Sequence, residues 1–202
     1  VCDDASNDGT WDLLQEWVAK DSRITALRNE DNLRAAATRN RCLAAAKGDY
    51  IALQDADDYS SPDRFETQMA FLEGHPEYDF VGAVMASFDE NGIWQELVHK
   101  AEPTRWDFVW RLPFNHAAVM FRKPALMAVG GYRVARETVR GQDLDLFMRL
   151  YAKGFKGYNL AETLYYYNED RANFSRRKYR YRIDEAIIRY KGYCAMGIMP
   201  LA

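Results

Sequence analysis

Residues 51–64 read IALQDADDYSSPDR. An apolar run typical of a buried strand stops at Gln54, and the carboxylates of Asp55, Asp57 and Asp58 follow within four positions. Carboxylates this close repel one another, and some tend to stay protonated unless a cation lies between them. The pattern therefore indicates either a fully solvated polar turn or a cation site at the carboxyl end of a strand.

A helix is expected directly after the acidic residues. Ser61 suits the N-cap and Pro62 suits the first helical position. Phe65, Met69 and Leu72 recur at helical spacing, so we expect them to form the buried face of this helix.

Strands and helices alternate along the rest of the chain. Strands are expected at residues 1–2, 23–29, 50–54, 116–122 and 158–168, with a hairpin over residues 78–98 that turns at Asn91-Gly92. Helices are expected at residues 8–20, 33–48, 61–74, 104–112, 124–129, 142–154 and 175–193. This order predicts an α/β fold with a mostly parallel sheet flanked by helices and a mixed C-terminal half. Such sheets bind ligands at the carboxyl ends of their strands, where the acidic residues lie.

Composition limits the classes of protein. The 202 residues suffice for one domain with a sizeable core, and we expect a single domain over residues 1–202. A net charge of −3 gives no reason to expect nucleic-acid binding, and no apolar run approaches the length of a membrane span. Cys2, Cys42 and Cys194 form neither a disulfide framework nor a zinc motif, which favours a reducing, cytoplasmic location. Val1 reads as the tail of a strand already under way, so we expect a fragment with at least one element upstream.

Three further polar stretches each allow a structural and a functional interpretation. Residues 3–10, DDASNDGT, are turn formers, and the alternative is a pocket where a carboxylate accepts the N–H of a uracil-like base. Arg39, on an alanine-rich helix, is either a surface residue or a contact to phosphate or base. Asp143 opens a helix, where a carboxylate complements the helix dipole, and in a cleft it would serve as a general base.

The order of these signals resembles the family 2 glycosyltransferases with the GT-A fold. The resemblance covers nearly the whole chain and rests on VCDDASNDGT, NEDNLRAAATRNRCLAAAKGDYIALQDADD, SPDRFETQMAFL, AVMFRKPALMAVGGY and GQDLDLFMRL. It implies a Rossmann-like domain with a nucleotide-sugar-binding half at residues 1–100 and an acceptor-binding half at residues 101–202. It also implies transfer of a sugar from a nucleotide-diphosphate sugar, most often UDP-linked, to a hydroxyl of a glycan or lipid-linked acceptor. The transfer would invert the anomeric carbon and use Mn²⁺ or Mg²⁺.

On the donor side, the resemblance assigns the nucleotide contacts. Asp4 corresponds to the carboxylate that reads the uracil, with Asp3 beside it, and Arg39 supplies a further contact. Asp55 corresponds to the first aspartate of the metal motif, facing ribose or metal.

The resemblance likewise assigns the metal and acceptor residues. Asp57 corresponds to the direct metal ligand, and Asp58 is its substitute. Asp143 corresponds to the catalytic base. The acceptor contacts are Gly131, Tyr132 and Gln142.

The sequence departs from the family pattern in three places. The first strand of the family fold is missing, Arg34 stands where the family has a glycine, and Gln142 replaces a glutamate. Because of these departures two rival functions stay open, a sugar nucleotidyltransferase and a non-catalytic nucleotide-sugar-binding module. The exposed sheet would also allow self-association. Three basic residues near the C-terminus allow two interpretations: Arg171, Arg176 and Arg177. They could contact a diphosphate or an acidic membrane surface, which would mean peripheral association with the inner face of a membrane. The alternative is a solvated basic helix start.

Overall fold

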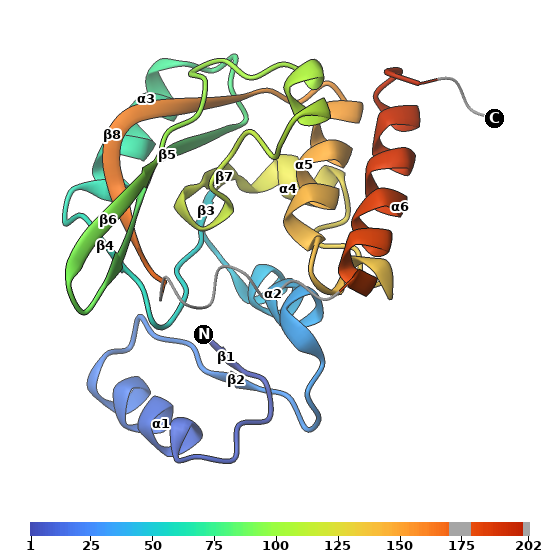
Figure 1. Cartoon of the computed structure of the whole chain (residues 1–202). Helices are drawn as coiled ribbons and strands as arrows, with labels where there is room; N and C mark the ends of the chain where they lie inside the picture. The colour runs from blue at the N-terminus through green and yellow to red at the C-terminus, as the bar shows by residue number, and fades with distance from the viewer. Residues whose placement is uncertain (170–178, 200–202) are drawn as a thin grey trace.

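A computed structural model describes residues 1–169 and 179–199 of the chain (Figure 1). The expectations for Arg171, Arg176 and Arg177 lie outside these described residues.

Two sheets organise the chain. The strands β1 (Cys2–Asp3) and β2 (Leu27–Arg28) pair in parallel as a two-stranded sheet. A six-stranded sheet has the order β3-β7-β5-β8-β4, with β6 also paired to β5. Its strands are β3 (Tyr50–Ala52), β4 (Tyr59–Ser60), β5 (Phe80–Asp89), β6 (Gly92–Leu97), β7 (Met120–Arg122) and β8 (Gly157–Asn168). The expected hairpin is confirmed, since β5 and β6 pair across the turn at Asn91-Gly92.

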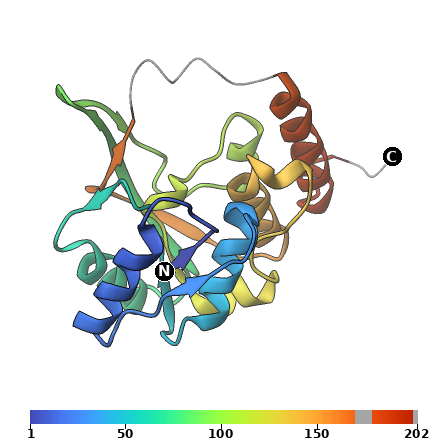
Figure 2. The same ribbon diagram turned by 90° about the horizontal axis from the view of Figure 1, so that it is seen from below.

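The helices connect these strands and pack around them. The α-helices are α1 (Thr10–Lys20), α2 (Arg34–Ala45), α3 (Arg64–Gly74), α4 (Lys123–Ala128), α5 (Gln142–Ala152) and α6 (Tyr179–Ala195). The short 3₁₀ helices are η1 (Arg105–Val109), η2 (His116–Ala118) and η3 (Glu137–Val139). In Figures 1 and 2, α1 with β1 and β2 lies at one end of the molecule and α6 at the other.

The expectation of a mostly parallel sheet is wrong for the six-stranded sheet. Only β5 and β8 pair in parallel there, and β7 lies antiparallel between β3 and β5. The strands β3 and β5, which α3 connects, therefore run in the same direction without being neighbours. Alternation of strands and helices fixes the relative direction of successive strands, but it does not say which later strand inserts between them.

The two faces of the sheet bury different helices. Phe80 of β5 and its cross-strand partner Phe121 pack with Phe147 of α5. The next positions, Val81 and Met120, point to the other face and pack with Leu72 of α3. This is the two-residue alternation of side chains along a strand, and it places the sheet between α3 and α5.

The buried face of α3 differs from the predicted one. Arg64, Gln68 and Leu72 are buried, whereas Phe65 and Met69 are 53% and 41% exposed. The guanidinium of Arg64 donates to the carbonyls of Leu53 and Ala117 and lies 4.8 Å from the ring centroid of Tyr165. Burial lowers the pKa of Arg64 to about 10. The helix is therefore rotated by one residue, because backbone carbonyls that need donors draw the polar side chains inward.

The expected strand at residues 116–122 is shorter than predicted. Residues His116–Ala118 form η2, and the strand begins at Met120. The carbonyls of Ala117 and Ala118 accept hydrogen bonds from Arg64 and Gln68 of α3. Since side chains satisfy these carbonyls, the segment needs no strand partner.

Within the described residues, Cys2, Cys42 and Cys194 form no disulfide. Among the helices of the described residues, none combines the length and the apolar composition needed to cross a bilayer.

Candidate active site

The acidic loop after β3 is held in place from two sides. Arg39 of α2 donates from Nη2 to Asp55 Oδ1 at 3.0 Å. The hydroxyl of Tyr165 in β8 accepts from the Asp55 amide at 3.1 Å and donates to Asp58 Oδ2 at 2.8 Å. The loop is thus tied to both α2 and β8, which fixes the positions of Asp55 and Asp58.

The three carboxylates of the loop have different environments. Asp58 also accepts from the backbone N–H of Asn168 at 2.8 Å, and burial, with the charges of Asp57 and Asp55, raises its pKa. Asp57 is exposed, and none of the described residues forms a hydrogen bond or ion pair with it. Asp57 is therefore the carboxylate best placed to bind an external ligand, while Asp58 anchors the loop to β8.

Asp4 organises the turn that begins α2. Its Oδ1 accepts from Asn29 Nδ2 at 2.6 Å and from the Leu33 amide at 2.8 Å, and its Oδ2 accepts from the Arg34 amide at 2.8 Å. Burial opposes ionisation, but these hydrogen bonds outweigh it and lower the pKa of Asp4. The neighbouring Asp3 is buried, accepting from the Ser6 amide at 3.0 Å, with Arg28 Nε 3.2 Å from its Oδ2.

Arg34 occupies a left-handed backbone conformation, with φ of 67°. This is the position where the family pattern has glycine, and glycine alone adopts such a φ without cost from a Cβ. The turn therefore keeps the left-handed conformation that suits glycine, although an arginine occupies the position. The hydrogen bonds from the Leu33 and Arg34 amides to Asp4 hold it there.

Arg34→Gly should stabilise the fold. Relief of the left-handed strain, about 1–2 kcal/mol, outweighs the added flexibility of glycine in the unfolded chain, about 0.5–1 kcal/mol. We expect a gain of about 0.5–1 kcal/mol, measured by urea unfolding. The matched control is Leu33→Gly, where φ is −89° and there is no strain to relieve, so the substitution should destabilise. Equal losses in both variants would contradict this account of the turn.

The segment Gly130-Gly131-Tyr132 packs directly on α2. Asn40 binds the backbone of Tyr132 twice, accepting from its N–H at 2.8 Å and donating to its C=O at 2.7 Å. Gly131 has φ of 67°, and a Cβ there would lie 2.5 Å from Asn40 Oδ1. Arg149 of α5 donates to the Gly131 carbonyl at 2.7 Å. Glycine is therefore required at position 131 by both its conformation and this close approach.

Tyr132 is buried and contacts residues from separate elements. Its hydroxyl hydrogen-bonds His116 Nε2 at 2.8 Å, and the Arg39 guanidinium lies 5.9 Å from its ring centroid. Burial raises the pKa of Tyr132; the charge of Arg39 lowers it, and those of Asp143 and Asp55 raise it further. Burial and the charge of Arg39 lower the pKa of His116 to about 3, so the imidazole is neutral.

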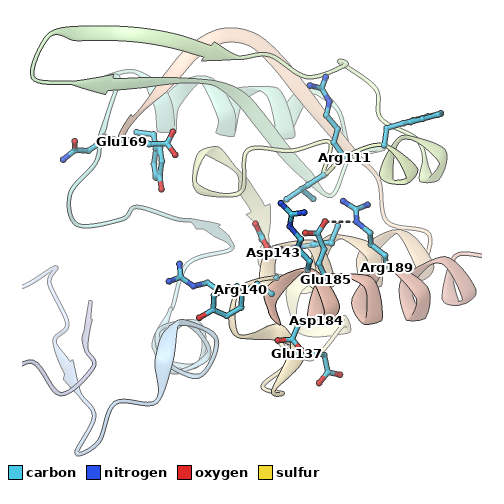
Figure 3. A pocket seen from close by; sticks show the side chains of 16 residues that line it. Arg111, Glu137, Arg140, Asp143, Glu169, Asp184, Glu185 and Arg189 are labelled. Carbon is cyan, nitrogen blue, oxygen red and sulfur yellow. Dashed lines mark hydrogen bonds and ion pairs between the residues drawn. The ribbon is translucent and has the colours of Figure 1, made fainter. Parts of the chain in front are cut away.

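Asp143 lines a large cleft at the start of α5 (Figure 3). The cleft has a volume of about 1080 Å³ and is bounded by residues 110–112 after η1, the start of α5, the end of β8 and α6. Figure 3 shows Asp143, Glu185 and Arg189 toward one side and Glu169 across from them. Glu185 and Arg189 form an ion pair at 2.9 Å.

Gln142 faces a different cavity from Asp143. It lines a smaller pocket of about 330 Å³ between the start of α2 and residues 134–139, with Leu33 and Val139 among its neighbours. Its Oε1 is buried without a hydrogen-bond partner. These two adjacent residues at the start of α5 therefore line separate cavities.

Within the described residues, no three acidic, histidine or cysteine side chains converge into a metal site. The chemistry of Asp55 and Asp57 still fits a hard cation. One oxygen of Asp55 pairs with Arg39, and the carboxylate of Asp57 is exposed. Magnesium-like ions are commonly held by one or two carboxylates, with phosphate oxygens completing the shell.

Sequence reasoning missed several residues that shape this site. They are Arg64, Gln68, His116, Arg149 and Tyr165. Each acts on residues far away in the chain, as Tyr165 does on Asp55 and Asp58. No local signal such as a cap or a turn marks them.

Comparison with known proteins identifies the chain as a glycosyltransferase and gives its family. The model of the family described as "Glycosyl transferase family 2" matches residues 1–140, and the chain belongs to this family. It is 43% identical over 203 residues to the putative glycosyltransferase EpsE of Bacillus subtilis. The match covers 100% of this chain and 73% of EpsE.

A second relative carries a more detailed name. The chain is 28% identical over 183 residues to the Escherichia coli protein WfaP, a UDP-Glc:alpha-D-GlcNAc-diphosphoundecaprenol beta-1,3-glucosyltransferase. The match covers 89% of this chain and 68% of WfaP.

Solved structures confirm the GT-A fold. Staphylococcus aureus TarS 1–349 in complex with UDP superposes with a TM-score of 0.75 at 18% identity, over 100% of this chain and 56% of that chain. The mannosyltransferase PcManGT of Pyrobaculum calidifontis, in complex with GDP-Man and Mn²⁺, gives a TM-score of 0.66 at 17% identity, over 100% of this chain and 55% of that chain. The chain therefore spans little more than half of either structure.

Proposed function

We propose that this glycosyltransferase moves a sugar from a UDP-sugar to a hydroxyl of a lipid-linked glycan in polysaccharide biosynthesis. The transfer inverts the anomeric carbon and uses Mn²⁺ or Mg²⁺. The names of WfaP and of the UDP-bound TarS structure support this donor, and the name of WfaP supports this acceptor.

The observation that carries the proposal is the gathering of charged residues from three separate elements around Tyr132. Arg39, Asp55 and Asp143 all act electrostatically on its hydroxyl, although they come from α2, the acidic loop and α5. A donor diphosphate at Asp55 and an acceptor at Asp143 would thus lie on neighbouring parts of one site. Tyr132, being buried, would position these elements rather than touch the acceptor with its ring.

On the donor side, Asp57 and Asp55 would hold the metal and Arg39 would contact the nucleotide. The metal, when bound, neutralises the diphosphate and stabilises the leaving UDP. Asp4 accepts from Asn29 and from the turn at 33–34, and a hydrogen bond from the Thr38 side chain also lowers its pKa. A carboxylate offers about four acceptor sites, so the uracil N3–H would have to take the place of one of these partners.

On the acceptor side, Asp143 would take the proton of the attacking hydroxyl. The hydroxyl oxygen forms a bond to the anomeric carbon as the bond from that carbon to the diphosphate oxygen breaks. The proton goes to Asp143 and the electron pair leaves with UDP. A single displacement of this kind inverts the anomeric centre and needs no covalent enzyme intermediate.

A donor screen tests the proposal. We expect UDP release from one or more UDP-sugars in Mn²⁺, coupled to transfer onto a diphosphate-lipid-linked sugar, with proton NMR showing inverted configuration in the product. Pyrophosphate formation from a nucleoside triphosphate and a sugar phosphate would instead establish a nucleotidyltransferase. Nucleotide binding without turnover, across UDP- and GDP-sugars, would establish a binding module.

A further inference from the structure

A cluster of large apolar side chains is exposed on η1 and the residue that follows it. Trp106, Val109 and Trp110 are 54%, 40% and 85% exposed. We call these three residues the η1 patch. Single exposed apolar residues are common on protein surfaces, but two exposed tryptophans and a valine within five residues are an unusual concentration of apolar surface.

The η1 patch is displayed on a well-anchored support. Thr104 and Asp107 cap η1 reciprocally, and Phe108 is fully buried in the core. Arg189 and Tyr193 of α6 both donate to the Phe108 carbonyl, at 2.7 and 3.1 Å. The outward position of the tryptophans is therefore fixed by the fold and is not the result of a loosely held segment.

Cationic side chains flank the patch. Arg105 and Arg111 are both exposed, and the guanidinium of Arg105 lies 5.4 Å from the ring centroid of Trp106. The acidic residue between them, Asp107, is engaged by Thr104 and Lys100. Aromatic rings with flanking arginines suit the interface of an anionic bilayer, where rings enter the headgroup region and arginines meet phosphate.

The patch also borders the cleft of Asp143. Trp110 and Arg111 line this cleft, whereas Trp106 and Val109 are not among its lining residues. A platform for an acceptor sugar would use Trp110 alone. A surface that extends from the rim to Trp106 and Val109 fits a partner larger than one sugar.

We propose that the η1 patch, with Arg105 and Arg111, docks the protein on an anionic phospholipid bilayer and holds the mouth of the Asp143 cleft at the membrane surface. Bilayer binding itself does not rest on the proposed function. The link between docking and a lipid-linked acceptor does rest on it.

Co-sedimentation of the protein with lipid vesicles tests the proposal. The wild type should bind vesicles of mixed phosphatidylcholine and phosphatidylglycerol more tightly than vesicles of phosphatidylcholine alone, and high salt should weaken this binding. The double variant Trp106→Ser/Trp110→Ser should bind the mixed vesicles about tenfold or more weakly, since two large apolar surfaces no longer leave water. Arg111→Gln should lose about fivefold.

The control is Trp17→Ser on α1, at the far end of the molecule from α6 (Figures 1 and 2). Trp17 is 49% exposed, similar to Trp106. Because Trp17 does not belong to the η1 patch, its loss should leave vesicle binding unchanged. Thermal melting of every variant checks folding, and the exposed positions predict unchanged midpoints. A double variant that melts lower would be replaced by Trp106→Ser alone, for which weaker vesicle binding is still expected.

Three results would overturn the proposal. The first is equal vesicle binding by the wild type and the double variant. The second is absence of vesicle binding together with a dimer that the double variant dissociates, because a second copy would then cover the patch. The third is unchanged vesicle binding by Trp106→Ser with lowered turnover of a soluble acceptor by Trp110→Ser, which would make Trp110 a sugar platform. Vesicle binding is measured without substrate, so a failed donor screen would not affect this test.

Discussion

Asp57→Ala should weaken UDP binding by about 100-fold in Mn²⁺ and leave it nearly unchanged in EDTA. Asp57 is exposed, whereas Asp58 is bonded to Tyr165 and Asn168, and Asp55 is paired with Arg39. The variant therefore removes the carboxylate that is most available to a cation and leaves the anchors of the loop intact. A metal contact to a diphosphate is worth several kcal/mol, and each 1.4 kcal/mol corresponds to a factor of ten in affinity.

Isothermal titration of UDP with and without Mn²⁺ measures this effect. Asp12→Ala, an exposed aspartate on α1, is the control for loss of one negative charge and should change neither affinity. The variant Asp58→Asn keeps one oxygen acceptor, enough for one of the two hydrogen bonds from Tyr165 and Asn168. It should therefore lower the stability of the fold but keep the Mn²⁺ dependence of UDP binding. If Asp57→Ala weakened UDP binding equally in Mn²⁺ and in EDTA, Asp57 would not be a metal ligand.

The position of the acidic loop followed from local signals. The apolar run before Gln54 predicted a strand, and Asp55, Asp57 and Asp58 do follow β3 in the structure. Asp143 likewise lies in the first turn of α5, where the helix spacing predicted it, and Phe147 and Leu150 are buried. These predictions succeeded because strand periodicity and helix starts are encoded within a few neighbouring residues.

The misses depend on contacts between distant segments. Phe65 is exposed and Arg64 buried because carbonyls at Leu53 and Ala117 need donors, and nothing near Arg64 in the sequence reveals them. The direction of β7 within the sheet depends on which strands it pairs with, and that is settled by the packing of Phe80 and Phe121.

The structure shows contacts of Asp4 and Gln142 that the sequence did not reveal. Asp4 holds the left-handed turn at Arg34, a task additional to the proposed reading of the base. Gln142 lines a pocket that is separate from the cleft of Asp143. Its proposed contact with the acceptor would therefore need an acceptor that reaches both cavities. The proposed chemistry accordingly concentrates on Asp143.

Asp143→Asn should lower sugar transfer by about 10²–10⁴-fold, the usual contribution of a general base, and leave UDP affinity almost intact. The amide is nearly the same size as the carboxylate but cannot accept the proton of the attacking hydroxyl. UDP affinity should persist because the proposed donor contacts, the acidic loop and Arg39, do not include Asp143. Steady-state rates with the identified donor and acceptor, together with UDP titration, measure the two effects separately.

The structural alternative is that Asp143 only supports the start of α5. Its Oδ1 accepts from the Leu144 amide at 2.8 Å, a bond that an asparagine oxygen also makes. On this alternative, Asp143→Asn would keep both the melting midpoint and the rate of transfer. If Asp143 is the general base, Asp143→Asn should keep the melting midpoint but lose the rate of sugar transfer. The rate of transfer therefore distinguishes the two interpretations.

The variant Glu185→Gln distinguishes the loss of a proton acceptor from the loss of a negative charge in the cleft. Glu185 lines the same cleft, and its carboxylate is already paired with Arg189 at 2.9 Å. Both substitutions remove one negative charge from the cleft, but only Asp143→Asn removes the proposed proton acceptor. A much larger loss for Asp143→Asn would therefore assign proton transfer to Asp143. Equal losses would mean that the charge of the cleft, and not a base at position 143, supports the reaction.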